Sequence, residues 1–157
     1  MQKKLSTAQI VVLLSGTLFA FYTVFIDFLR FYQYEGTFFK VKDCIYPNPV
    51  TTPCFYGAFA FLLALLWAYK IKDTVGSNDF LVKQKKLIYF LVVGTIFAWS
   101  NFGILYVKFL NTPAGEQFSC SGVPATSPFT TACFVGSTVF LVSLILGIVL
   151  YRKVPAN

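Results

Sequence analysis

Four long apolar runs limit the possible folds of this sequence more strongly than any other feature. They lie at residues 8–29, 55–71, 87–107 and 134–151. A helix needs about 17–25 mostly apolar residues to cross a hydrocarbon core of about 30 Å. The runs therefore predict an all-α integral membrane protein with four transmembrane helices. The second and fourth runs are short, so we expect these two helices either to stand upright or to begin in the preceding loop.

The composition agrees with a membrane protein and excludes several kinds of site. Only 12% of the residues are charged, whereas soluble domains carry about 25% charged residues. The chain contains no histidine, which excludes histidine-ligated metals and histidine general bases within it. The net charge of +7 sits mainly at the ends of the apolar runs, as topology signals do. We therefore expect no nucleic-acid partner.

Lysine and arginine residues are distributed unevenly between the two sides of the predicted spans. Nine of the 13 lie on the side that holds both termini and the loop between the second and third runs. Because positive residues favour the cytoplasmic side, we expect both termini in the cytoplasm, and the loops 31–54 and 108–133 outside a plasma (inner) membrane. The basic inner face suits anionic headgroups, which makes membrane lipid an expected partner.

The two halves of the sequence match each other in order. Residues 16–21 (GTLFAF) return as 94–99 (GTIFAW), and residues 49–57 (PVTTPCFYG) return as 128–136 (PFTTACFVG). Ordered matches at a nearly constant offset indicate an internal duplication.

The duplication predicts two helix–loop–helix repeats, 1–75 and 87–157, joined by a cytoplasmic linker at 76–86. Each repeat contains two spans, so both repeats keep the same orientation in the membrane. Parallel repeats of this kind are related by an axis along the membrane normal. We therefore expect a small four-helix bundle with a pseudo-twofold axis along that normal.

All four cysteines lie in or next to the predicted outer loops. The first repeat holds Cys44 and Cys54, and the second holds Cys120 and Cys133. An oxidising compartment permits disulfides, and the repeat predicts one pair within each copy, Cys44–Cys54 and Cys120–Cys133. Each bridge would tie a loop to the start of the next helix and stabilise the fold by roughly 2–3 kcal/mol. A zinc site made by all four cysteines is disfavoured because the usual C-x2–4-C spacing is absent.

The same cysteines also permit redox chemistry. A Thr-Pro pair before Cys54 is typical of a helix start, and Cys133 has the matching position, so both thiols would lie at helix N-termini, where thiolates are favoured. Four spans with two outer cysteine pairs resemble the bacterial disulfide-bond-forming oxidases and the vitamin K epoxide reductases, which are quinone-linked. This resemblance implies an oxidoreductase that uses Cys54 and Cys133 with Cys44 and Cys120. Those families carry a CxxC motif, which this sequence lacks.

Small residues recur every four positions in the second run, at Ala60, Ala64 and Ala68. Ser143 and Gly147 occupy the positions in the fourth run that match the last two. Such stripes allow helices to approach closely. We expect these residues to pack the helices within the bundle, with an oligomer contact as the alternative.

Few polar side chains lie within the runs. Asp27 is the only acid there, and we expect it to be solvated at the outer boundary and paired with Arg30, three residues further along the helix. Thr17 and Thr95 occupy matching positions in the two halves. We expect these two threonines to make helix–helix hydrogen bonds.

These features favour a non-catalytic function. We expect a disulfide-stapled four-helix protein that acts as a subunit, scaffold or lipid-embedded binding module, without cofactor or metal. Its expected partners are other membrane proteins or further copies of itself. The first alternative is the quinone-linked thiol–disulfide oxidoreductase. The second is a small channel or transporter, which is disfavoured because few polar residues could line a path.

Overall fold

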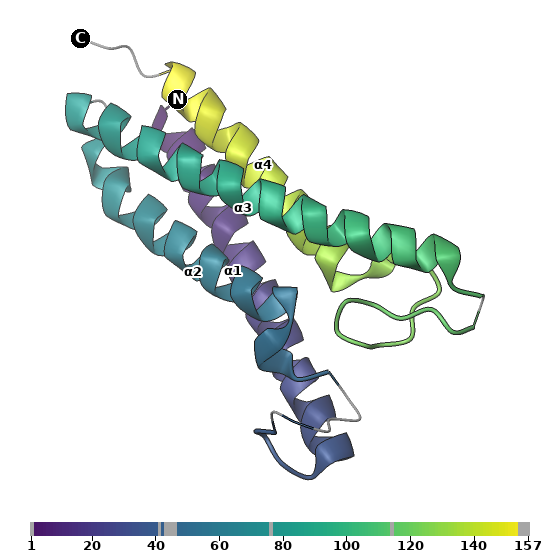
Figure 1. Cartoon of the computed structure of the whole chain (residues 1–157). Helices are drawn as coiled ribbons and strands as arrows, with labels where there is room; N and C mark the ends of the chain where they lie inside the picture. The colour runs from purple at the N-terminus through teal and green to yellow at the C-terminus, as the bar shows by residue number, and fades with distance from the viewer. Residues whose placement is uncertain (1, 41, 43–46, 76, 114, 154–157) are drawn as a thin grey trace.

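The computed structural model describes residues 2–40, 42, 47–75, 77–113 and 115–153, and this part of the chain is all-α (Figure 1). Its four long helices are each long and apolar enough to cross a membrane, as the apolar runs predicted. They are α1 (Gln2–Glu35), α2 (Pro53–Ile71), α3 (Asn78–Asn111) and α4 (Ala132–Lys153).

The first and third helices are longer than the apolar runs that predicted them. Each has 34 residues, a length of about 51 Å at 1.5 Å per residue. The helix α3 begins inside the segment predicted as a linker, where Ser77 Oγ accepts a hydrogen bond from the Phe80 backbone N–H at 3.3 Å. The helix α1 is followed by Gly36, whose φ of 68° is the left-handed conformation of a helix C-terminal cap. Both helices are therefore long enough to project from a hydrocarbon core of about 30 Å.

The two shorter helices begin in the same way. A short 3-10 turn precedes each of them, η1 (Pro49–Thr51) before α2 and η3 (Pro128–Thr130) before α4. The Thr52 and Thr131 hydroxyls each donate a hydrogen bond of 2.7 Å to the carbonyl of the first residue of the turn. Thr52 is the N-cap of α2, as predicted, although its side chain accepts no capping hydrogen bond.

The core contains two aromatic rings packed over two glycines. Phe61 of α2 and Phe140 of α4 stack with ring centroids 4.0 Å apart. A Cβ atom added to Gly16 would lie 2.6 Å from the Phe61 ring, and one added to Gly94 would lie 2.8 Å from the Phe140 ring. Each ring therefore occupies space that only a glycine on the neighbouring helix leaves free.

The bundle has two distinct ends. At the terminal end, the start of α1 meets the end of α4, and Gln2 Nε2 donates a hydrogen bond to the Lys153 carbonyl at 2.9 Å. At the opposite end, which we call the loop end, the α1–α2 hairpin diverges from the α3–α4 hairpin. The segment between α3 and η3 turns back towards the first hairpin there (Figure 1).

The prediction that Thr17 and Thr95 make hydrogen bonds between helices is wrong. Each hydroxyl instead donates to a carbonyl four residues earlier in its own helix, at 2.7 Å. This back-bonding satisfies a buried hydroxyl without a second helix. Besides the bond from Gln2 to Lys153, helices are joined by Gln84, whose Nε2 donates to Gln9 Oε1 at 3.2 Å and to the Gly147 carbonyl at 3.3 Å.

Candidate functional site

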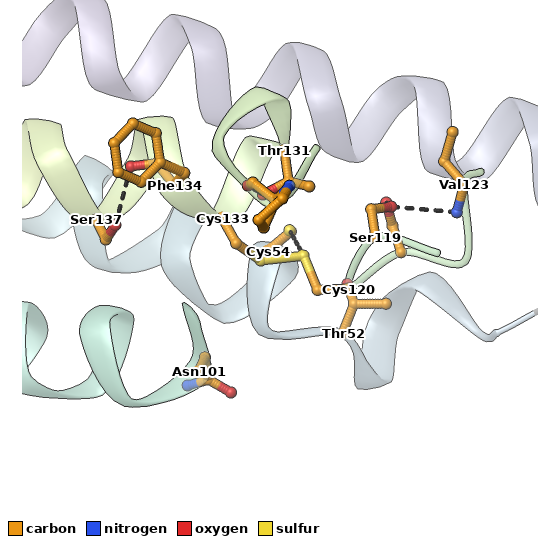
Figure 2. Close-up of a disulfide and its surroundings, with 12 residues drawn as sticks. Thr52, Cys54, Asn101, Ser119, Cys120, Val123, Thr131, Cys133, Phe134 and Ser137 are labelled. Carbon is orange, nitrogen blue, oxygen red and sulfur yellow. Dashed lines mark hydrogen bonds between the residues drawn. A yellow bond between two sulfur atoms is a disulfide. The ribbon is translucent and has the colours of Figure 1, made fainter. Parts of the chain in front are cut away.

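Three of the four cysteines meet at the loop end of the bundle. Cys120 and Cys133 form a disulfide with an S–S distance of 2.06 Å, as the repeat predicted. The Cys54 Sγ lies 3.5 Å from the Cys120 Sγ, and all three sulfur atoms lie within 4.8 Å of one another. Figure 2 shows the free sulfur beside the bridge. The repeat did not predict this contact between the two halves.

Helix ends and a tight turn position these sulfur atoms. Cys54 and Cys133 lie in the first turns of α2 and α4, so two helix N-termini point towards the cluster. Cys120 lies in a turn closed by Ser119 and Val123 (Figure 2). The Ser119 backbone N–H donates to the Val123 carbonyl at 2.7 Å, and the Val123 N–H donates to Ser119 Oγ at 3.1 Å. This turn holds Cys120 against the start of α2.

The second predicted disulfide is not tested by the structure. Cys54 is partly buried and carries a free thiol. Its predicted partner, Cys44, lies outside the described residues, so the Cys44–Cys54 pairing stays a prediction. That pairing and a free Cys54 thiol exclude each other.

The arrangement is suited to thiol–disulfide exchange. In that reaction a thiolate attacks one sulfur of a disulfide and displaces the other as a thiolate. Attack by Cys54 on Cys120 would displace Cys133. The departing Cys133 thiolate would lie at the N-terminus of α4, where the helix dipole favours negative charge. The short distance from Cys54 to Cys120 and the position of Cys133 at a helix N-terminus therefore both favour attack of Cys54 on Cys120.

An apolar cavity of about 70 Å³ adjoins two of the three sulfur atoms. Residues of all four helices line it, and they include five pairs of identical residues that match between the two halves of the sequence. These pairs are Phe19 with Phe97, Ala20 with Ala98, Cys54 with Cys133, Gly57 with Gly136, and Phe61 with Phe140. A water molecule needs about 10–15 Å³, whereas a cavity that holds benzene has about 150 Å³. The cavity therefore has room for roughly five waters and would have to widen to hold a six-membered ring.

The third sulfur faces a different space. Cys120 and Ser119 line a larger hollow of about 400 Å³ at the loop end, together with Lys108 and Glu116. Cys54 and Cys133 do not line this hollow, and Cys120 does not line the apolar cavity. An exchange between Cys54 and Cys120 would therefore connect a larger hollow that contains charged side chains with an apolar cavity.

The prediction that Asp27 is solvated is wrong. Asp27 is only 4% exposed, and the expected pairing with Arg30 is present at a distance of 4.0 Å between Oδ1 and Nη1. A groove next to the cysteine cluster is lined by Asp27, Ser121 and Thr131. The loop that carries Ser121 covers the carboxylate, an arrangement that the repeat did not indicate because Leu105 matches Asp27.

The small residues predicted to pack helices lie on inward faces of their helices. Ala64, Ala68, Ser143 and Gly147 are buried, whereas Ala60 is half-buried and lines the apolar cavity. The four buried residues lie between the helices, as predicted for packing.

A buried polar cluster lies further towards the terminal end. Gln9 and Gln84 are 2% and 0% exposed, and they contact each other across α1 and α3. Within the described part of the chain, Gln9 Nε2, Gln84 Oε1 and Ser143 Oγ have no hydrogen-bond partner. The sequence signal for this cluster was weak, since each glutamine is isolated and the two do not match in the repeat.

The fold and site define a four-helix protein with four candidate membrane spans and a disulfide at the loop end. No protein-family model matches the sequence, and no curated protein or solved structure matches it significantly. The function therefore has to be inferred from the site itself.

Proposed function

We propose that this protein is a membrane thiol–disulfide oxidoreductase in which Cys54 exchanges with the Cys120–Cys133 disulfide. The observation that carries the proposal is the distance of 3.5 Å between Cys54 Sγ and Cys120 Sγ. A disulfide that only braces a loop needs no third sulfur within reach. An internal relay of the disulfide needs one, because exchange requires sulfur atoms in near contact.

The exchange balances with three cysteines. The Cys54 thiolate attacks Cys120, the Cys54–Cys120 bond forms, and Cys133 leaves as a thiolate that takes up the proton lost by Cys54. A client dithiol in the larger hollow attacks Cys120 and releases Cys54, and the second client thiol then releases Cys120. The client loses two electrons and two protons and becomes a disulfide. Cys120 and Cys133 gain them and become thiols.

The apolar cavity supports a quinone as the acceptor that restores the disulfide. Cys54 and Cys133 line this cavity, so a quinone ring that widens it from the bilayer side would meet both sulfur atoms. A quinone takes two electrons and two protons from the Cys54 and Cys133 thiols to become a quinol, and a Cys54–Cys133 disulfide forms. Attack of the Cys120 thiolate on Cys133 then releases Cys54, which takes up the proton that Cys120 lost, and restores the Cys120–Cys133 bond. A membrane-spanning protein has access to such an apolar acceptor in the bilayer.

A non-catalytic scaffold is the second candidate. The Cys120–Cys133 disulfide favours it, because the bridge ties the segment before η3 to the start of α4. A channel has less support, since the stacked Phe61 and Phe140 rings fill the space between α2 and α4.

We also propose that the two hairpins are parallel repeats with both termini in the cytoplasm of a plasma (inner) membrane. Matched sequence positions make matched contacts, which supports the repeat. Examples are the Thr52 and Thr131 hydrogen bonds and the packing of Gly16 and Gly94. The asymmetry of lysine and arginine supports the orientation.

The test is quinone reduction by purified, oxidised protein in detergent. A dithiol peptide and a short-chain quinone are supplied, and quinol formation is followed by absorbance. We expect turnover by the wild-type chain and its loss in Cys54→Ser. The Cys44→Ser variant is the matched control and should keep its activity, because the exchange uses only Cys54, Cys120 and Cys133. Equal activity of Cys54→Ser and wild type, or no activity in any variant, would overturn the proposal. The non-catalytic scaffold would then be the better-supported function.

A further inference from the structure

We propose that Cys54, Cys120 and Cys133 form a three-thiolate site for monovalent copper when the Cys120–Cys133 disulfide is reduced. All three Sγ atoms lie within 4.8 Å of one another. The inference uses the same sulfur atoms as the proposed oxidoreductase but does not require that the protein turn over a substrate.

The spacing suits three-coordinate binding. With metal–sulfur distances of about 2.3 Å, as in protein thiolate sites, the sulfur atoms of a trigonal site lie about 4 Å apart. The Cys54–Cys120 distance of 3.5 Å is already close to this value. Reduction has to separate Cys120 from Cys133, and Cys120 can move because it lies in a loop, not in a helix.

The chemical type and number of the ligands indicate which metal ion the site would bind. Three thiolates are soft ligands, which Cu(I) prefers, whereas carboxylate and carbonyl oxygens suit harder ions. Structural zinc almost always takes four ligands, and the cluster of described residues offers three. The chain has no histidine to complete a zinc site. Cys44 is therefore the residue whose replacement separates a three-thiolate copper site from a four-thiolate zinc site.

The redox state of the disulfide controls this site. In the oxidised chain, Cys54 is the one free thiol among the three clustered cysteines. A dithiol reductant supplies two electrons and two protons, breaks the Cys120–Cys133 bond and becomes a disulfide itself. Binding of Cu(I) then displaces the protons of the three thiols. The bound ion holds the sulfur atoms as thiolates and blocks re-formation of the disulfide, so it would inhibit the proposed exchange.

The experiment measures Cu(I) binding to the full chain in detergent under anaerobic conditions. Cu(I) is supplied from a coloured chelator complex, and the protein is compared before and after reduction and removal of the reductant. We expect the reduced wild type to take one Cu(I) ion from the chelator and the oxidised protein to take none. Loss of an outer-shell partner of a metal site weakens binding by about 10–100-fold. Cys54→Ser removes a direct ligand and should weaken it by more than about 100-fold.

The Cys44→Ser variant is the matched control and should bind Cu(I) as the wild type does. Equal binding by the reduced and oxidised wild type would overturn the site. So would a loss in Cys44→Ser as large as the loss in Cys54→Ser, which would indicate a four-thiolate zinc-type site. Formation of the Cys120–Cys133 disulfide in Cys54→Ser, checked by mass spectrometry, shows that this variant still folds at the loop end. Because the binding assay contains no quinone and the activity assay no copper, failure of one proposal is distinguishable from failure of the other.

Discussion

Phe61 and Phe140 stack against each other with ring centroids 4.0 Å apart, and each ring covers a glycine of another helix. The two phenylalanines occupy matching positions in the two halves of the sequence, and so do the glycines beneath them, Gly16 and Gly94. Neither ring can move away from its glycine without disturbing the other, since both are buried. This contact therefore couples the packing of the two hairpins.

The first prediction concerns Gly94. A methyl group there would lie 2.8 Å from the Phe140 ring, which is held in place by Phe61. We expect Gly94→Ala to lower the free energy of unfolding by about 1–3 kcal/mol, as overpacking of a core does. Gly103→Ala, in the same helix, is the matched control. No atom lies within 4 Å of a Cβ there, so the better helix propensity of alanine should raise stability by about 1 kcal/mol.

Thermal unfolding in detergent, followed by circular dichroism, measures both variants. A Gly94→Ala protein as stable as Gly103→Ala would show that the Phe140 ring is free to relax. The account of the core given by Phe61 and Phe140 would then be incorrect.

The second prediction concerns the buried glutamines. Replacing Gln84 by leucine removes its hydrogen bonds to Gln9 and to the Gly147 carbonyl. Because Gln9 would remain buried without that partner, we expect Gln84→Leu to destabilise the bundle by about 1–3 kcal/mol. The double variant Gln9→Leu/Gln84→Leu removes both polar groups and should cost less than the sum of the two single changes. If the loss of stability in the double variant equals the sum of the losses in the two single variants, the two amides do not interact directly.

The helices were predictable because their apolar runs are long, but their ends were not. The extensions of α1 and α3 mix polar and charged residues with apolar ones, among them the buried Phe31 and Phe80. They therefore form no continuous apolar run that would mark where the helices end. The disulfide Cys120–Cys133 followed from the repeat, which pairs cysteines within one copy. The approach of Cys54 to Cys120 depends on how the segment before η3 folds back over the other copy. No local pattern encodes such a contact.

Polar contacts inside the bundle were the least predictable feature. Thr17 and Thr95 were expected to join helices because they recur, yet a threonine in a helix can satisfy its hydroxyl with its own backbone. Gln9 and Gln84 do join helices, although they do not match in the repeat. A glutamine side chain is long and flexible, so the position of a glutamine in the sequence does not indicate which helix its amide group reaches.

The third prediction concerns orientation. We expect the loop end outside the cell and the terminal end in the cytoplasm, since lysine and arginine residues gather at the terminal end. An impermeant maleimide added to intact cells after reduction should label Cys120. In a variant with no other cysteine, Asp73→Cys places a thiol on the opposite side and should be labelled only after permeabilisation. Labelling of Asp73→Cys in intact cells would reverse the assignment.

The last prediction tests the contact that carries the proposed function. In Cys133→Ser, Cys120 loses its disulfide partner, and the nearest described sulfur is Cys54 at 3.5 Å. We expect a Cys54–Cys120 disulfide to form, because a neighbouring thiol that is already in near contact competes better than one that must be brought from a distance. Peptide mapping by mass spectrometry without reduction identifies the pair. The Cys54→Ser/Cys133→Ser variant, its matched control, should leave Cys120 as a free thiol. Pairing of Cys120 with Cys44 in Cys133→Ser, or two free thiols at Cys54 and Cys120, would show that these sulfur atoms do not exchange.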